Sequence, residues 1–130
     1  MKTKTIRQTI TFKASPHYVY EALMDSRKHS EFTGGKAVIS RKIGGKFTAY
    51  DGYAEGTNLE LAKDKKIVQK WRADDWPEGH YSTVTFELKK VEGGTKLKFM
   101  QTGVPEDQYG PIGEGWVEFY WDNMKKMLEK

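Results

Sequence analysis

At 130 residues the chain fits one domain, and a content of 37% hydrophobic and 13% aromatic residues supplies a core and excludes a disordered chain. Its apolar runs are too short to span a membrane, its first residues lack the apolar stretch of a signal peptide, and the absence of cysteine excludes disulfides. The net charge of +4, from 22 basic and 18 acidic residues, favours acidic partners, but no helix-turn-helix, zinc or aromatic-basic motif indicates nucleic-acid binding. We therefore expect a single cytoplasmic domain over residues 1–130, with no membrane span and no nucleic-acid partner.

The N-terminal part of the sequence predicts a strand followed by one or two short helices. Residues 3–13 alternate between inward and outward side chains, which is typical of a half-buried strand. In the segment ASPHYVYEALMD, Ser15 is suited to cap a helix and Pro16 to occupy its first position. Ser26 is suited to cap a further short turn through Phe32.

From residue 36 the apolar pattern takes a period close to two. It predicts strands at 36–41, 46–51, 53–62, 66–73, 81–90 and 95–102. Turn signals such as Gly44-Gly45, Asp51-Gly52 and Gly93-Gly94 separate these strands, and connections this short imply antiparallel neighbours. The sequence therefore predicts an antiparallel meander.

The last segment of the chain has a helical period. An apolar stripe of about twenty residues begins at Pro111 and contains Ile112, Trp116, Phe119, Tyr120, Asn123, Met124, Met127 and Leu128. Gly113 and Gly115 are expected to weaken the first turns of this helix, by about 1 kcal/mol each relative to alanine.

These elements predict an α+β fold of the helix-grip type. A curved antiparallel sheet of six to seven strands is expected to wrap around the long C-terminal helix, because its apolar face is the large apolar surface left for that helix. Helix and sheet that touch at one end and diverge at the other leave room for an internal cavity.

The sequence offers little catalytic or metal-binding chemistry. The three histidines, His17, His29 and His80, are far apart and lack metal-ligand spacing. We expect His17 at a helix start, His29 in a polar turn and His80 at a strand start, as surface or hydrogen-bonding residues. Gln8, Gln101 and Asn123 are expected to point inward, but they form no acid–base pair. No catalytic residue, cofactor site or metal site is predicted.

The large aromatic side chains carry more information. Trp71 ends a strand and is expected in the core, whereas Trp76 lies in the turn that contains Pro77 and Gly79. Its ring is expected either to fold back over the open end of the gap between sheet and helix or to contact a partner. The rings of the C-terminal helix either line a cavity or simply fill it. The candidate cavity or interaction residues are Trp71, Trp76, His80, Phe99, Trp116, Phe119 and Tyr120.

Three segments together resemble a known family. They are KKIVQKWRADDWPEGHYSTVTFEL, GVPEDQYGPIGEGWVEFYWDNMKKML and GGKFTAYDGYAEGTNLEL, and they resemble the C-terminal domain of the activators of the heat-shock protein 90 ATPase. That domain belongs to the START-like, SRPBCC superfamily of helix-grip proteins. The residues that match the family's motifs are Trp71, Arg72, Trp76, Pro77, Gly79 and His80, followed by Gly103, Pro105, Gly115, Trp116 and Tyr120.

The resemblance implies a non-enzymatic, co-chaperone-like domain of the stress response whose partner is a heat-shock protein 90-type chaperone. We expect a stand-alone form, because nothing in the sequence corresponds to the family's N-terminal chaperone-binding domain. The segment QYGPIGEGW also replaces the charged, uninterrupted helix start that is usual in the family. The superfamily leaves an alternative open, a binder or carrier of a small hydrophobic ligand in an internal cavity, with a cyclase-type enzyme less expected.

Overall fold

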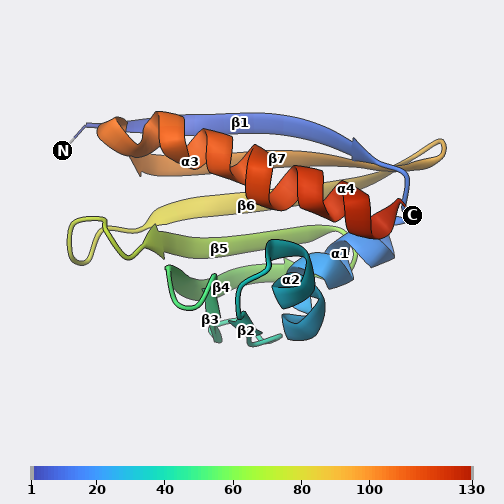
Figure 1. Ribbon diagram of the computed structural model, residues 1–130, viewed down its shortest axis with the longest axis horizontal. Helices are drawn as coiled ribbons and strands as arrows, with labels where there is room; N and C mark the ends of the chain where they lie inside the picture. Colours follow the sequence, from blue (N-terminus) through green and yellow to red (C-terminus); the bar gives the residue numbers. More distant parts are fainter. Residues whose placement is uncertain (1, 130) are drawn as a thin grey trace.

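The computed structural model describes residues 2–129, which form one curved antiparallel sheet with the helices on one of its faces (Figure 1). In chain order the elements are β1 (Thr3–Phe12), α1 (Pro16–Met24), α2 (Ser26–Thr33), β2 (Val38–Ile39), β3 (Lys46–Ala49), β4 (Ala54–Ala62), β5 (Lys66–Ala73), β6 (Ser82–Val91), β7 (Gly94–Pro105), the 3₁₀ turn η1 (Glu106–Gln108), α3 (Tyr109–Gly115), the π-helical segment η2 (Trp116–Trp121) and α4 (Asp122–Leu128). The α+β helix-grip fold predicted from the sequence is confirmed.

The seven strands of this sheet lie in the order β1-β7-β6-β5-β4-β3-β2, and all neighbours are antiparallel. Strands β2 to β7 form the expected meander, and β1 completes the sheet beside β7, where Ile6 pairs with Gln101. Several boundaries differ from the sequence prediction by one or two residues, such as the end of β3 at Ala49 in place of residue 51, and two differ by more. The strand expected at 36–41 is reduced to Val38–Ile39, and β7 continues past residue 102 to Pro105.

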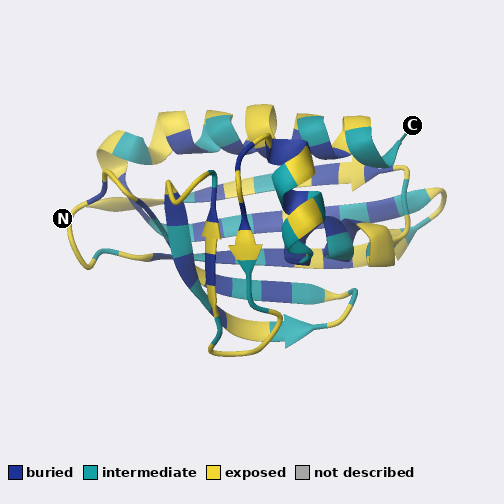
Figure 2. Cartoon of the chain, turned by 60° about the horizontal axis from the view of Figure 1, so that its bottom comes forward, coloured by how far each residue is buried: buried dark blue, intermediate teal, exposed yellow. Residues whose placement is uncertain are grey.

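The core lies between the concave face of the sheet and the helices, as the burial of alternate residues shows (Figure 2). In β6, for example, Val84, Phe86 and Leu88 are buried, whereas the neighbouring Glu87 and Lys89 face the solvent. This period of two places one complete apolar face of the sheet under the C-terminal helix.

The two short helices begin differently from the prediction. The side chain of Ser15 makes no capping hydrogen bond, although Pro16 does occupy the first position of α1. The cap of α2 is Asp25, whose Oδ1 accepts the backbone N–H of Lys28 at 2.9 Å. Ser26 instead accepts the N–H of Ile39 at 2.9 Å, which ties α2 to β2.

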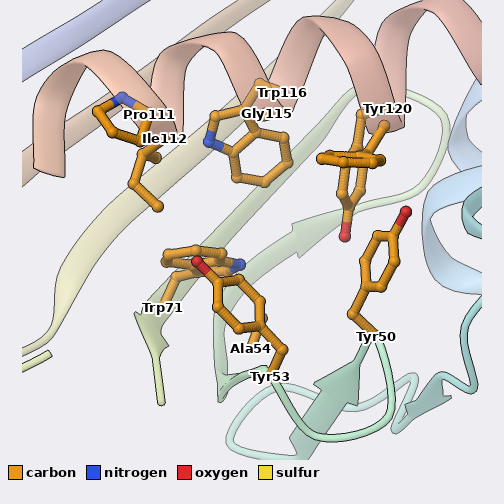
Figure 3. Close-up of a pocket in the computed structure, with 10 residues that line it drawn as sticks. Tyr50, Tyr53, Ala54, Trp71, Pro111, Ile112, Gly115, Trp116 and Tyr120 are labelled. Carbon is orange, nitrogen blue, oxygen red and sulfur yellow. The ribbon is translucent and has the colours of Figure 1, made fainter. Parts of the chain in front are cut away.

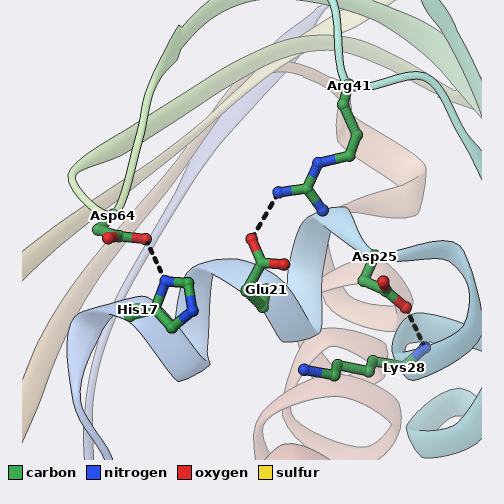
Figure 4. A network of polar contacts seen from close by, with 6 residues as sticks. All are labelled: His17, Glu21, Asp25, Lys28, Arg41 and Asp64. Atoms are coloured by element: carbon green, nitrogen blue, oxygen red, sulfur yellow. Dashed lines mark hydrogen bonds and ion pairs between the residues drawn. The ribbon is translucent and has the colours of Figure 1, made fainter.

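Helix α1 is also tied to two loops of the sheet (Figure 4). His17, at the start of the helix as expected, makes a contact of 3.1 Å with Asp64 in the β4–β5 turn. Glu21, one turn further along, accepts a hydrogen bond from Arg41 in the β2–β3 loop. These exposed pairs orient the helix and add little stability, since exposed ion pairs typically contribute below about 1 kcal/mol.

The C-terminal helix begins at Tyr109, two residues earlier than the expected start at Pro111. A proline is tolerated there because the first N–H groups of a helix have no partner within the helix. The larger difference is the π-helical turn of η2, whose i→i+5 hydrogen bonds place more residues in each turn and bring the Trp121 ring into a stacked arrangement with that of Trp116, with centroids 5.7 Å apart. Trp121 is therefore buried, and Phe119, which the regular stripe placed inside, is 42% exposed.

Candidate functional site

A pocket of about 290 Å³ lies between the first half of the C-terminal helix and the sheet (Figure 3). The turn between β3 and β4 and the end of β5 supply one wall, and α3 and η2 supply the other. Its lining residues are Tyr50, Tyr53, Ala54, Trp71, Pro111, Ile112, Gly115, Trp116, Phe119 and Tyr120. The wall is almost wholly apolar, and six of these ten side chains are aromatic rings.

The tyrosines of the first wall are held by a strained turn. Tyr50 and Asp51 have φ values of 55° and 57°, a left-handed conformation that is unfavourable for residues other than glycine. Gly52 follows with a φ of 94°. The turn is fixed because Oδ1 of Asp51 accepts the backbone N–H of Lys36 at 2.9 Å. The Tyr50 ring thereby meets that of Phe119 edge to face across the pocket, at a centroid distance of 5.4 Å.

Trp116 and Trp71, which face each other across the pocket, belong to one hydrogen-bonded chain. The indole Nε1–H of Trp116 donates to Oε1 of Gln101 at 2.8 Å. The amide of Gln101 donates in turn to Oγ of Ser82 at 3.0 Å, and that hydroxyl donates to the Trp71 carbonyl at 2.8 Å. Because every member of this chain is buried and paired, the Trp116 indole is tied to the backbone of β5 at Trp71.

A second glutamine joins the same helix to β1. Oε1 of Gln8 accepts the Nε1–H of Trp121 at 2.6 Å, and the Gln8 amide donates to the Gly113 carbonyl at 3.0 Å. The expectation that Gln8 and Gln101 point inward is therefore confirmed. Asn123 differs, because it is only half-buried and its amide donates to the Phe119 carbonyl of its own helix at 3.1 Å.

His29 and Tyr120 form a buried polar pair beside the pocket. The expectation of His29 in a polar turn is wrong, since it lies in α2 and is buried because Tyr120 and Phe32 pack on its ring. Its Nδ1 lies 3.0 Å from the Leu23 carbonyl and its Nε2 lies 2.8 Å from the Tyr120 hydroxyl. Burial lowers the pKa of His29 to about 4, despite the opposing hydrogen bond to Leu23, and raises the pKa of Tyr120.

Trp76 lies outside the pocket and folds back on Trp71. It is 4% exposed, and the two indoles meet edge to face with centroids 5.4 Å apart. Arg72 closes the loop by donating to the Trp76 carbonyl at 2.7 Å. His80 is a hydrogen-bonding residue as expected, but its partner lies on β7 and not across the turn: Nε2 donates to the Gly103 carbonyl at 2.7 Å.

The structure thus brings together four of the seven candidate residues and separates three. Trp71, Trp116, Phe119 and Tyr120 line the pocket, whereas Trp76 and His80 lie in the loop beyond it. Phe99 is 2% exposed and packs beneath Trp116 in the filled core, at a centroid distance of 4.5 Å.

Sequence reasoning missed three residues of this region, namely Tyr50, Tyr53 and His29. The two tyrosines flank the Asp51-Gly52 turn signal, so two aromatic rings at a tight turn were the available signal for the pocket wall. No comparable signal marked His29, because its hydrogen-bond partner is distant in the sequence.

Metal-binding clusters and membrane-spanning helices are both absent from residues 2–129. That range contains no group of three or more His, Cys, Asp or Glu side chains that could hold a metal ion. None of its helices is both long and apolar enough to cross a membrane.

Comparison with known proteins gives one consistent result. Residues 13–129 match the family model described as "Activator of Hsp90 ATPase homolog 1-like protein". A relative from Dictyostelium discoideum named activator of 90 kDa heat shock protein ATPase homolog is 35% identical over 125 residues, which make up 95% of this chain and 32% of the relative. Human activator of 90 kDa heat shock protein ATPase homolog 1 is 32% identical over 128 residues, which make up 97% of this chain and 38% of the relative.

A solved structure supports the same assignment. The crystal structure of an HSP90 activator from Plasmodium falciparum matches with a TM-score of 0.89 at 30% identity, and the match covers 96% of both chains. The curated relatives are longer, and the present chain spans about a third of their length.

Proposed function

The chain belongs to the family of activator of Hsp90 ATPase homolog 1-like proteins, and on this premise we propose that it acts as a non-enzymatic, cytoplasmic co-chaperone domain that binds an Hsp90-type chaperone. The observation that carries the proposal is the extent of the similarity. The family model spans residues 13–129, and the Plasmodium falciparum HSP90 activator shares the fold over nearly the whole of both chains. The relatives are named activators or co-chaperones, which supports a binding role.

The test separates binding from activation, since the chain covers only about a third of the relatives named for the activity. Binding of the purified chain to a purified Hsp90-type chaperone is measured by calorimetry, and ATP hydrolysis by the chaperone is measured with and without the chain. We expect binding together with faster hydrolysis. Binding without acceleration would restrict the role to docking, and no binding would overturn the proposal.

A second function is favoured by the pocket itself. A space of about 290 Å³ walled by six aromatic rings is suited to a small apolar ligand, because such pockets are typically apolar with a few placed polar groups. We propose that the pocket binds a small, neutral, hydrophobic molecule.

The pocket function is tested with the neutral fluorescent probe N-phenyl-1-naphthylamine and one pair of variants. Gly115 lines the pocket, so Gly115→Leu is expected to fill it and abolish the rise in probe fluorescence. Glu114→Leu introduces the same side chain at the adjacent exposed position, and there the signal should be retained. Equal signals from both variants would overturn the pocket function.

A further inference from the structure

The hydrogen-bond direction in the buried pair beside the pocket follows from its partners. A backbone carbonyl only accepts, so the contact of 3.0 Å to the Leu23 carbonyl places a hydrogen on Nδ1 of His29. Burial keeps the imidazole neutral near pH 7, since its pKa is lowered to about 4. Nε2 of His29 therefore carries no hydrogen and accepts the hydroxyl hydrogen of Tyr120 across 2.8 Å.

This direction determines what Tyr120 offers to a ligand. Burial raises its pKa, so the phenol stays protonated, and its single hydrogen is already donated to His29. The ring lines both the pocket and a smaller void of about 20 Å³ behind it, and Figure 3 shows the hydroxyl end directed away from the helix into the gap beside Tyr50. The Tyr120 oxygen therefore has lone pairs, and no hydrogen, left to offer to a further partner.

We infer that the pocket selects flat, neutral aromatic molecules that carry an O–H or N–H group at their inner end, with Tyr120 as the acceptor. This inference rests on the pocket function proposed above. A ligand with a hydroxyl at that end donates to the Tyr120 oxygen and leaves the bond to His29 intact. A ligand with only a carbonyl at that end places its own acceptor oxygen against the Tyr120 oxygen, which is also an acceptor, and no hydrogen bond forms between them.

The alternative would be rotation of the Tyr120 hydroxyl toward such a carbonyl. That rotation removes the hydrogen bond from Nε2 of His29 and leaves a buried acceptor without a partner, which cancels the gain. The size and the lining of the pocket determine the size and the charge of the ligand. About 290 Å³ between rings accommodates a bicyclic aromatic molecule, and the ten lining residues include no charged side chain that would pair with an ionic group.

Three probes of similar shape test this preference. The Kd of each probe for a variant is compared with the Kd of the same probe for the unaltered protein, so that differences in hydrophobicity between the probes cancel. The probes are 2-naphthol, 2-methylnaphthalene and 2-naphthaldehyde, with Kd values measured by ligand-detected NMR at pH 7. Tyr120→Phe should weaken the binding of 2-naphthol about 3- to 10-fold, which corresponds to the loss of one hydrogen bond. The affinity for 2-methylnaphthalene should be unchanged.

His29→Leu should have the opposite effect, tighter binding of the carbonyl probe. It also tests the inference independently if Tyr120→Phe folds poorly. Without the imidazole acceptor the Tyr120 hydroxyl is free to donate, so 2-naphthaldehyde should bind about 3- to 10-fold more tightly than to the unaltered protein. Thermal melting confirms that each variant is folded.

The two possible failures can be told apart. If the probes bind but Tyr120→Phe affects 2-naphthol no more than 2-methylnaphthalene, the donor preference is overturned and the pocket function stands. If none of the three probes binds to the unaltered protein, the pocket function itself fails and this inference fails with it.

Discussion

The two flanks of the C-terminal helix are packed in different ways. On the flank that faces β1 and β7, the indoles of Trp121 and Trp116 donate to Gln8 and Gln101, and the hollow along β1 is a half-polar surface groove that includes the charged Asp122 and Lys125. On the flank that faces β5 and the β3–β4 turn, the aromatic rings contact one another mainly through carbon, and the pocket remains. We call these the bonded flank and the open flank.

The difference shows how a small domain keeps a pocket without losing its core. Leaving a buried indole N–H unpaired costs free energy, so the bonds to Gln8 and Gln101 favour one height and rotation of the helix over the sheet. Once these directional bonds set the helix on the bonded flank, the other flank does not have to close. The strained turn at Tyr50 and Asp51 then holds the Tyr50 ring edge to face against Phe119, and the pocket remains beside this contact.

The largest expected effect is on the bonded flank. Trp121→Ala removes a ring that is 2% exposed, together with its bond to Gln8, and should lower the free energy of unfolding by about 3 to 5 kcal/mol. Phe119→Ala on the open flank should cost below about 1 kcal/mol, because that ring is 42% exposed. Urea denaturation of both variants checks the contrast, and equal losses would remove the distinction between the flanks.

Trp76 closes the outer end of the open flank through its contact with Trp71. Trp76→Ala should therefore lower the free energy of unfolding by about 2 to 4 kcal/mol and the melting temperature by several degrees. Trp76→Phe is the matched control and should cost less, because the buried indole N–H of Trp76 has no partner among residues 2–129. Unchanged stability with loss of chaperone binding in Trp76→Ala would instead identify an interface residue.

The inner end of the open flank should respond to pH through His29. Between its ordinary pKa of 6.5 and its lowered pKa of about 4, the unfolded chain binds a proton that the folded chain does not. The free energy of unfolding should therefore fall as the pH falls through that window, by about 3 kcal/mol in total, and this contribution ends below it. Denaturation at several pH values measures the slope, and His29→Leu should lack this part of it. Parallel slopes in the two proteins would contradict the assignment.

The smallest expected change in stability is at Gly115, where the pocket leaves space beside the helix. A Cβ at Gly115 would lie 3.8 Å from Cδ2 of Phe119, an ordinary contact, so Gly115→Ala should raise the free energy of unfolding by up to about 1 kcal/mol through helix propensity. Gly56→Ala is the opposing control, since its Cβ would fall 1.7 Å from the Lys70 carbonyl oxygen. A loss of stability in Gly115→Ala would mean that the open flank is tighter than described.

The fold was predictable from the sequence because its signals are local. Alternation in 81–90 and the turn residues between the strands predicted the sheet, and the helical stripe predicted which face of the C-terminal helix is buried. The exceptions have specific causes. A π-helical turn changes which rings point inward after Trp116, and no periodicity rule based on 3.6 residues anticipates it.

The pocket was predictable only in part. Trp71, Trp116 and Tyr120 were expected from their positions on a strand and a helix that face each other. The remaining features depend on pairs of residues far apart in the sequence, such as Tyr120 with His29 and Tyr50 with Phe119. Such contacts follow from the curvature of the sheet and the strain of one turn, which residue patterns do not encode.

The pairing of β1 with β7 has a consequence for synthesis of the chain on the ribosome. The first strand to emerge has its partner in the last strand to be made. Until β7 has left the ribosome, the apolar side chains of Ile6, Ile10 and Phe12 have no sheet to join, and the helix that would cover them does not yet exist. Because this contact also closes a long loop, folding should be slow relative to a helical domain of the same size. The nascent domain thus exposes an unpaired apolar strand until β7 has been made, which is the state in which aggregation competes with folding.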